Sequence, residues 1–147
     1  METQIERIEK DIEKISTFNA TPEKGTSRFT FSKEHMAARS YVAHELTQIG
    51  ALVSTTIGGN LRGRLEGTEK GSPPVMMGSH LDTVLNGGRF DGVVGVVAGL
   101  EAARVIVEKK FPHRHPIDVV IFAEEIRKFL SRKFSKTAEN LSLHNHT

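Results

Sequence analysis

Several features are absent from this sequence of 147 residues, and each absence excludes a kind of site or a kind of segment. It contains no cysteine, which excludes a disulfide framework, a thiol nucleophile and any cysteine-based zinc or iron–sulfur site. Its longest apolar stretch, residues 93–100, is too short to cross a bilayer. Residues 1–14 are rich in Glu and Lys, unlike a signal or transit peptide. We therefore expect a cytoplasmic protein in which any metal is bound by histidines and carboxylates.

The sequence has only a small excess of positive charge, and that excess lies in its last part. Twenty basic residues stand against 18 acidic ones, for a net charge of +2. Residues 126–147 hold five basic residues and one acidic residue, so this tail carries +4 and residues 1–125 carry −2. A slightly acidic body gives no indication of a nucleic acid or membrane partner.

Apolar residues at helical spacing predict two helices in the first 50 residues. Isoleucines at positions 5, 8, 12 and 15 form one stripe with charged residues between them. A second helix is expected to begin after Ser32, a suitable N-cap, and to end at Gly50. Its inner face would carry Ala38, Val42, Leu46 and Ile49.

The next 75 residues alternate between strand and helix patterns. Residues 51–57 and 60–65 indicate a hairpin, and residues 75–79 a short buried strand. A helix is expected over residues 92–109. The continuous apolar run at 117–123 is typical of a central strand covered on both faces. This alternation predicts an α/β layer structure with parallel neighbours.

Residues that could carry chemistry cluster in the glycine-rich segment 79–92. His80 and Asp82 are two residues apart at a strand end, so their side chains point the same way. The carboxylate could accept one imidazole N–H and leave the other nitrogen free for a metal; alternatively, His80 is a hydrogen-bonded structural histidine. Asp91 precedes a helix start at Gly92, where open α/β sheets bind ligands. The nucleotide patterns G-x-G-x-x-G and G-K-[ST] are absent from this loop.

Two more carboxylates, Glu124 and Glu125, follow the apolar strand at 117–123. One member of such a pair can hold a metal while the other takes a proton from bound water. The alternative is a solvated strand end. His113 and His115 precede this strand, away from its active-site end, and are expected in a surface turn.

Four motifs lie at 26–32 (Thr-Ser-Arg-Phe-Thr-Phe-Ser), 59–64 (Gly-Asn-Leu-Arg-Gly-Arg), 78–84 (Gly-Ser-His-Leu-Asp-Thr-Val) and 86–92 (Asn-Gly-Gly-Arg-Phe-Asp-Gly). Together they resemble the N-carbamoyl-L-amino acid hydrolase and allantoate amidohydrolase group. These are dinuclear-metal amidohydrolases related to aminoacylases and zinc carboxypeptidases. The resemblance implies an incomplete three-layer α/β catalytic domain of the zinc-exopeptidase type over residues 1–125. It also implies hydrolysis of linear amide or ureido C–N bonds with two divalent metals, Zn²⁺ or Mn²⁺/Co²⁺.

The resemblance assigns a role to each candidate in the glycine-rich segment. His80 would bind one metal, and Asp91 would bridge both metals. Asp82 would orient the imidazole of His80. In such a site the metals polarise the substrate carbonyl and lower the pKa of a bridging water.

The group has a Glu-Glu pair followed by Gly after the central strand, the first Glu being the general base and the second a metal ligand. In the register we prefer, Glu125 is the base and Ile126 occupies the ligand position. In the other register, Glu124 is the base and Glu125 the ligand, and Ile126 replaces the Gly.

The family pattern ends at residue 125, before the later metal-binding histidines and the lid and dimerisation domain of the group. We therefore expect a chain that is inactive alone, binds metal weakly and associates through its uncovered sheet. Intact members of the group are expected to be homodimers that act on a small molecule. The alternative is a non-catalytic binding or regulatory module. The basic tail, residues 126–147, is interpreted as aberrant sequence rather than as a surface-binding helix.

Overall fold

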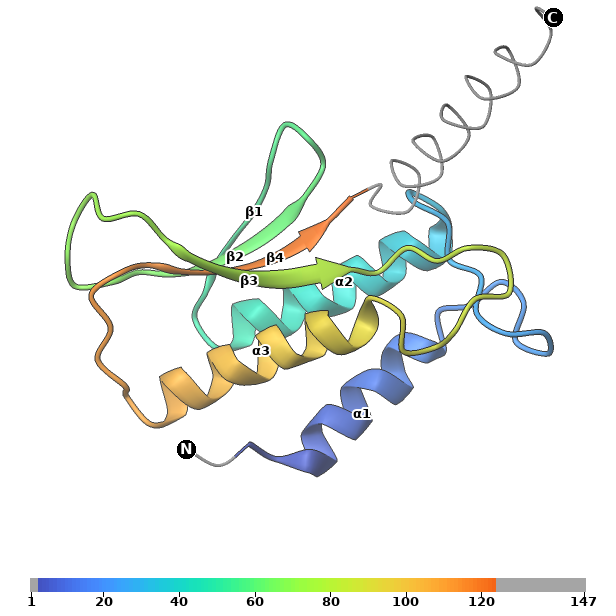
Figure 1. The fold of residues 1–147 in the computed structure, drawn as a ribbon, viewed down its shortest axis with the longest axis horizontal. Helices are drawn as coiled ribbons and strands as arrows, with labels where there is room; N and C mark the ends of the chain where they lie inside the picture. The colour runs from blue at the N-terminus through green and yellow to red at the C-terminus, as the bar shows by residue number, and fades with distance from the viewer. Residues whose placement is uncertain (1–2, 124–147) are drawn as a thin grey trace, which may run out of the picture.

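The computed structural model describes residues 3–123, which contain one mixed four-stranded sheet with the strand order β1-β2-β4-β3. Its strands are β1 (Leu52–Thr55), β2 (Leu61–Leu65), β3 (Val75–His80) and β4 (Ile117–Phe122). β1 and β2 form an antiparallel hairpin, β2 pairs antiparallel with β4, and β4 pairs parallel with β3 (Figure 1). The central place predicted for the strand at 117–123 is confirmed.

Three helices occur in the described part of the chain, and all three were predicted. They are α1 (Ile5–Ser16), α2 (Lys33–Gln48) and α3 (Val93–Glu108). The side chain of Ser32 caps α2 by accepting a hydrogen bond of 3.2 Å from the amide of His35. The helices lie on one side of the sheet, where α2 packs on β1 and β2 while α3 packs on β3 and β4 (Figure 1). No helix within residues 3–123 is long and apolar enough to cross a membrane.

The core lies between the sheet and the two helices α2 and α3. It includes Leu46 from α2, Leu61 from β2, Val97 and Leu100 from α3, and Ile121 from β4. Close approach of α3 to the sheet depends on glycine. A Cβ on Gly95 would lie 2.6 Å from the Cβ of Ser79, and one on Gly99 would lie 3.4 Å from a methyl of Val119.

One prediction for the sheet is wrong: residues 75–79 are not a buried strand. Val75 and Met76 are 58% and 57% exposed. The reason is the position of β3, which pairs only with β4 in the described part of the chain and so forms an edge of the sheet. Apolar composition made this strand look covered, whereas its burial depends on neighbours outside β3.

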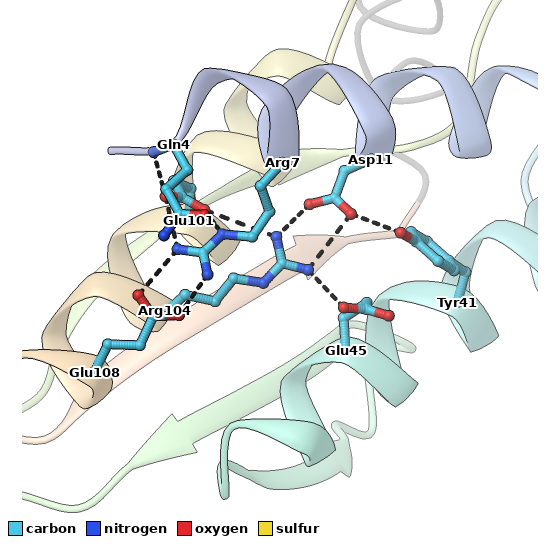
Figure 2. A network of polar contacts seen from close by, with 8 residues as sticks. All are labelled: Gln4, Arg7, Asp11, Tyr41, Glu45, Glu101, Arg104 and Glu108. Carbon is cyan, nitrogen blue, oxygen red and sulfur yellow. Dashed lines mark hydrogen bonds and ion pairs between the residues drawn. The ribbon is translucent and has the colours of Figure 1, made fainter. Parts of the chain in front are cut away.

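A network of buried charges fixes α1 against α3 and α2 (Figure 2). Asp11 on α1 pairs with Arg104 on α3 and accepts a hydrogen bond of 2.6 Å from the hydroxyl of Tyr41 on α2. Arg104 also contacts Glu45 at 2.6 Å. Burial and the bond to Asp11 together raise the pKa of Tyr41. These contacts join elements far apart in the chain into one body.

A second part of the network holds the first turn of α1. Arg7 contacts Glu101 at 2.7 Å and also pairs with Glu108, while the amide of Gln4 donates to Glu101. Burial alone would raise the pKa of Glu101, but the hydrogen bonds from Arg7 and Gln4 outweigh it and lower that pKa. Glu101 is therefore held as a charged acceptor although it is only 1% exposed.

The parallel pairing of β3 with β4 brings their carboxyl ends to the same edge of the sheet. His80, the last residue of β3, stands opposite Phe122 of β4. Leu81 and Ala123, the described residues that follow these two strands, therefore lie at the same edge. Glu124, Glu125 and the tail at 126–147 lie outside the described residues, so the predictions for them stay predictions.

Candidate active site

His80 is positioned by the end of β3 with its two ring nitrogens facing different groups. Nδ1 lies 2.9 Å from the backbone carbonyl oxygen of Asp82. Nε2 lies 4.0 Å from Oδ1 of Asp91, and the His80 side chain is 14% exposed. A neutral ring that donates from Nδ1 to this carbonyl leaves Nε2 unprotonated toward Asp91. The structure therefore brings the side chains of His80 and Asp91 together, the two residues to which the resemblance gives metal-binding roles.

Asp82 meets His80 through a different atom from the one expected. Its carboxylate Oδ1 is 3.7 Å from Nδ1 of His80, too long for a hydrogen bond. The backbone carbonyl of the same residue occupies the acceptor position instead. The Asp82 side chain is 3% exposed, and its charge acts on two buried basic residues, Arg28 and His35.

Asp91 stands at the entrance of α3 with a side chain that is 60% exposed. The next residue, Gly92, is the N-cap of α3 and has a φ of 69°. A Cβ there would lie 2.4 Å from the carbonyl oxygen of His80 and 2.6 Å from its ring. Gly92 therefore allows the imidazole to pack directly against the start of the helix, where the positive end of the helix dipole favours a carboxylate.

Arg28 is a buried part of the site's surroundings that sequence reasoning did not assign. It lies in the loop between α1 and α2, is fully buried and donates from Nε to the carbonyl of Leu81 at 2.6 Å. Its backbone amide donates to the hydroxyl of Thr83 at 2.8 Å, and the amide of Thr83 donates back to the carbonyl of Arg28. The motif at 26–32 contained this residue, but nothing local indicated that its guanidinium is inside.

Two further basic residues, His35 and Arg39 on α2, are buried although the sequence indicated only an apolar inner face. Nδ1 of His35 accepts a hydrogen bond of 3.1 Å from the amide of Phe31. Burial lowers the pKa of His35 to about 4, and the charge of Arg39 acts in the same direction. His35 is thus neutral at physiological pH. Buried polar side chains, and not only apolar ones, therefore lie near Asp82.

The donor set at the end of β3 fits a divalent metal. Imidazole nitrogen and carboxylate oxygen are zinc ligands with bonds of about 2.0–2.2 Å, so His80 and Asp91 at 4.0 Å could reach one ion. Within residues 3–123, no three His, Asp or Glu side chains converge to hold a metal. A complete centre therefore requires ligands from outside the described residues, where Glu125 also lies.

His113 and His115 take no part in this site. Nδ1 of His113 faces the carbonyl of His115 at 2.8 Å, and Nδ1 of His115 faces the carbonyl of Pro73 at 2.9 Å. Both histidines precede β4, at the opposite end of the sheet from His80, as the sequence predicts.

Two curated relatives carry the same segment within much longer chains. The N-carbamoyl-L-amino-acid amidohydrolase of Paenarthrobacter aurescens is 43% identical over 122 residues, which are 83% of this chain and 29% of that one. The allantoate amidohydrolase of Bacillus subtilis is 33% identical over 78% of this chain and 28% of its own length. The chain thus spans less than a third of the length of these relatives, which are amidohydrolases.

A solved structure extends the likeness to the fold. A hydantoinase/carbamoylase family amidase from Burkholderia ambifaria matches 84% of this chain and 30% of its own, with a TM-score of 0.81 and 34% identity. The predicted α/β class and the resemblance to the carbamoylase and allantoate amidohydrolase group are confirmed.

A family model matches residues 60–145, more than half of the chain. The match extends past residue 125 into residues 126–147, which we interpreted from the sequence as a tail outside the family pattern. The boundary between residues 1–125 and this tail stays a prediction. The matched family is peptidase family M28, and the chain belongs to it.

Proposed function

We propose that this chain forms part of the catalytic domain of a metal-dependent amidohydrolase. The substrates would be linear amide or ureido compounds such as N-carbamoyl-L-amino acids or allantoate. The observation that carries the proposal is the pairing of His80 with Asp91, in which Nε2 faces a carboxylate at 4.0 Å while Nδ1 is held by a carbonyl. The names of the relatives support this substrate class.

Each residue has a distinct task in this proposal. His80 and Asp91 would hold divalent metal, Zn²⁺ or Mn²⁺/Co²⁺, and Asp82 would keep the His80 ring in place. A metal bound there would supply a Lewis acid for the scissile carbonyl and would lower the pKa of a water molecule. Glu125 would accept the proton of that water as general base. The carboxylate of Asp91, exposed at the start of α3, is open to a ligand from solvent.

The chain by itself is proposed to be inactive. The described residues bring two candidate metal ligands together, whereas catalytic zinc sites use three protein ligands. This same shortage favours one alternative, a non-catalytic fragment that serves as a binding or regulatory module.

A chimera tests the proposal. Residues 3–123 of this chain would replace the matching segment of the Paenarthrobacter aurescens relative, and hydrolysis of N-carbamoyl-L-amino acids and allantoate would be measured with added Zn²⁺, Mn²⁺ or Co²⁺. We expect turnover that His80→Ala and Asp91→Ala both abolish. The matched control is His113→Ala, which changes a histidine at the other end of the sheet and should keep full activity.

Two results would contradict the proposal. A folded chimera without turnover, beside an active parent enzyme, would favour the non-catalytic module. Turnover by the 147-residue chain alone, lost in His80→Ala, would disprove its inactivity while supporting the assignment of the site.

A further inference from the structure

Arg28 joins two segments that lie far apart in the sequence. Its Nη1 donates to the carbonyls of Ile15 and Phe18, at 3.0 and 3.1 Å, at the carboxyl end of α1. Its Nε donates to the carbonyl of Leu81 at 2.6 Å, just beyond β3. One planar guanidinium thus binds the end of a helix and the segment that follows the candidate metal ligand. A lysine, with a single ammonium, could not span both sets of carbonyls in this geometry.

The contacts of Arg28 fall on both neighbours of Asp82. Leu81 is held by the guanidinium, and Thr83 is held by two hydrogen bonds to the Arg28 backbone. The hydroxyl of Thr83 also donates to the carbonyl of Thr26 at 3.0 Å. Asp82 is therefore fixed from either side, and its carbonyl is the atom that faces Nδ1 of His80 at 2.9 Å.

Burying the guanidinium of Arg28 carries a cost in free energy. A fully buried guanidinium loses its hydration, and such a charge is tolerated only when it is hydrogen-bonded or paired. Burial lowers the pKa of Arg28 to about 10, and the nearby charge of Asp82 opposes that shift. Arg28 thus stays charged at neutral pH. Three backbone carbonyls accept hydrogen bonds from its guanidinium.

We propose that Arg28 is a positioning residue for His80. By holding Leu81 and Thr83, it keeps the carbonyl of Asp82 against Nδ1, so that the ring carries its proton there and presents Nε2 toward Asp91. A group that sets the ring orientation and tautomer of a metal-binding histidine is as much a part of the site as the ligand itself. The proposal rests on the proposed function in taking His80 as a metal ligand, but its test needs no turnover.

The test is the tautomer of His80 in the complete, metal-free chain labelled with ¹⁵N. Long-range ¹H–¹⁵N correlation spectra would be recorded at pH 9, where imidazoles are neutral, and His80→Ala would identify the signals. In the unchanged chain we expect the proton on Nδ1. In Arg28→Lys we expect a mixture of both tautomers, and a Zn²⁺ affinity lower by about tenfold.

Arg104→Lys is the matched control. Arg104 is another buried arginine, 4% exposed, and it anchors α1 through Asp11 rather than through the segment after β3. This variant should lose stability and yet keep the proton of His80 on Nδ1. An equal change of tautomer in Arg104→Lys would show general loosening of the fold and would overturn the proposal.

Two other results would also overturn it: a proton on Nε2 of His80 in the unchanged chain, or a folded Arg28→Lys with an unaltered tautomer. If Arg28→Lys does not fold, Thr83→Val takes its place, because it releases the same segment without touching the guanidinium. Failure of the proposed function would look different. The tautomers would behave as expected, but Zn²⁺ binding would be unaffected by His80→Ala.

Discussion

Gly92 shows how strongly a single residue constrains the candidate site. Its φ of 69° lies in the left-handed region, and a Cβ would collide with both the carbonyl and the ring of His80. Any side chain at this position must therefore change the backbone, the imidazole or both. The site is built from a strand end and a helix start that touch because one of them has no side chain.

Gly92→Ala is expected to destabilise the chain by about 1–3 kcal/mol, because strained backbone and a displaced His80 act together. Urea unfolding followed by circular dichroism measures the loss. The control is Gly88→Ala in the same loop, where an added Cβ would meet nothing within 4 Å. Equal stabilities for the two variants would show that the packing of His80 on Gly92 is unimportant.

His35 is expected to make stability depend on pH. Its pKa is about 4 in the folded chain because of burial, against about 6.5 when unfolded. Between these values the unfolded chain binds more protons, so this contribution is complete above pH 6.5 and is lost as the pH falls toward 4. The slope would reach at most about 1.4 kcal/mol per pH unit.

Urea unfolding at pH 6.5 and 4.5 measures this dependence. In His35→Gln the fall in stability between the two pH values should be smaller than in the unchanged chain. His44 is exposed on the same helix, so His44→Gln should leave the fall unaltered. An identical pH dependence in all three proteins would mean that His35 is accessible to protons in the folded state.

At the scale of elements, α1 is attached to the rest of the fold by charges as well as by apolar contacts. Ile12 and Ile15 enter the core, but Asp11 on the same helix is 1% exposed and pairs with the equally buried Arg104 (Figure 2). Arg28 binds the other end of the helix. A buried pair of this kind is most costly when one partner is removed, because the remaining charge stays inside.

Asp11→Ala should therefore destabilise the chain by about 3 kcal/mol, measured by chemical unfolding. Glu108→Ala removes a carboxylate from the exposed end of the same network, and its effect should be much smaller because solvent screens that pair. If both variants lost much unfolding free energy, or if neither did, the stabilisation by these ion pairs would not depend on their burial.

At the scale of the whole molecule, β3 leaves one edge of the sheet unpaired within the described residues. β3 contains no Lys, Arg, Asp or Glu, and its Val75 and Met76 are more than half exposed. Exposed apolar edge strands pair readily with other chains. We propose that copies of this chain associate along β3.

Sedimentation velocity across a range of concentrations should show association that weakens in Met76→Lys, since a charge on the edge opposes strand pairing. The control is Ile57→Lys, which changes a fully exposed apolar residue at the tip of the β1–β2 hairpin. A monomer at all concentrations would rule out association, and an equal effect of both variants would place the contact elsewhere.

Much of the fold follows from local pattern alone. The stripe of isoleucines predicts α1, the capping Ser32 predicts the start of α2, and the apolar run at 117–123 predicts a central strand, all as observed. These elements can be predicted because the spacing of apolar residues in a helix or a strand repeats within a few residues of sequence. The family resemblance implied that His80 and Asp91 share a site, and their side chains lie 4.0 Å apart in the structure.

The tertiary structure decided what depends on distant partners. Arg28 and His35 are fully buried although neither residue type is usually so, and Asp11 contacts Arg104 across 93 positions of sequence. The chain order of Asp82 and His80 suggested a carboxylate contact, but the fold after β3 turns the carbonyl toward the ring instead. Residue types and spacing thus determined the elements and the candidate ligands. Packing decided which polar atoms face each other, because burial and orientation are properties of the neighbours and not of the residue.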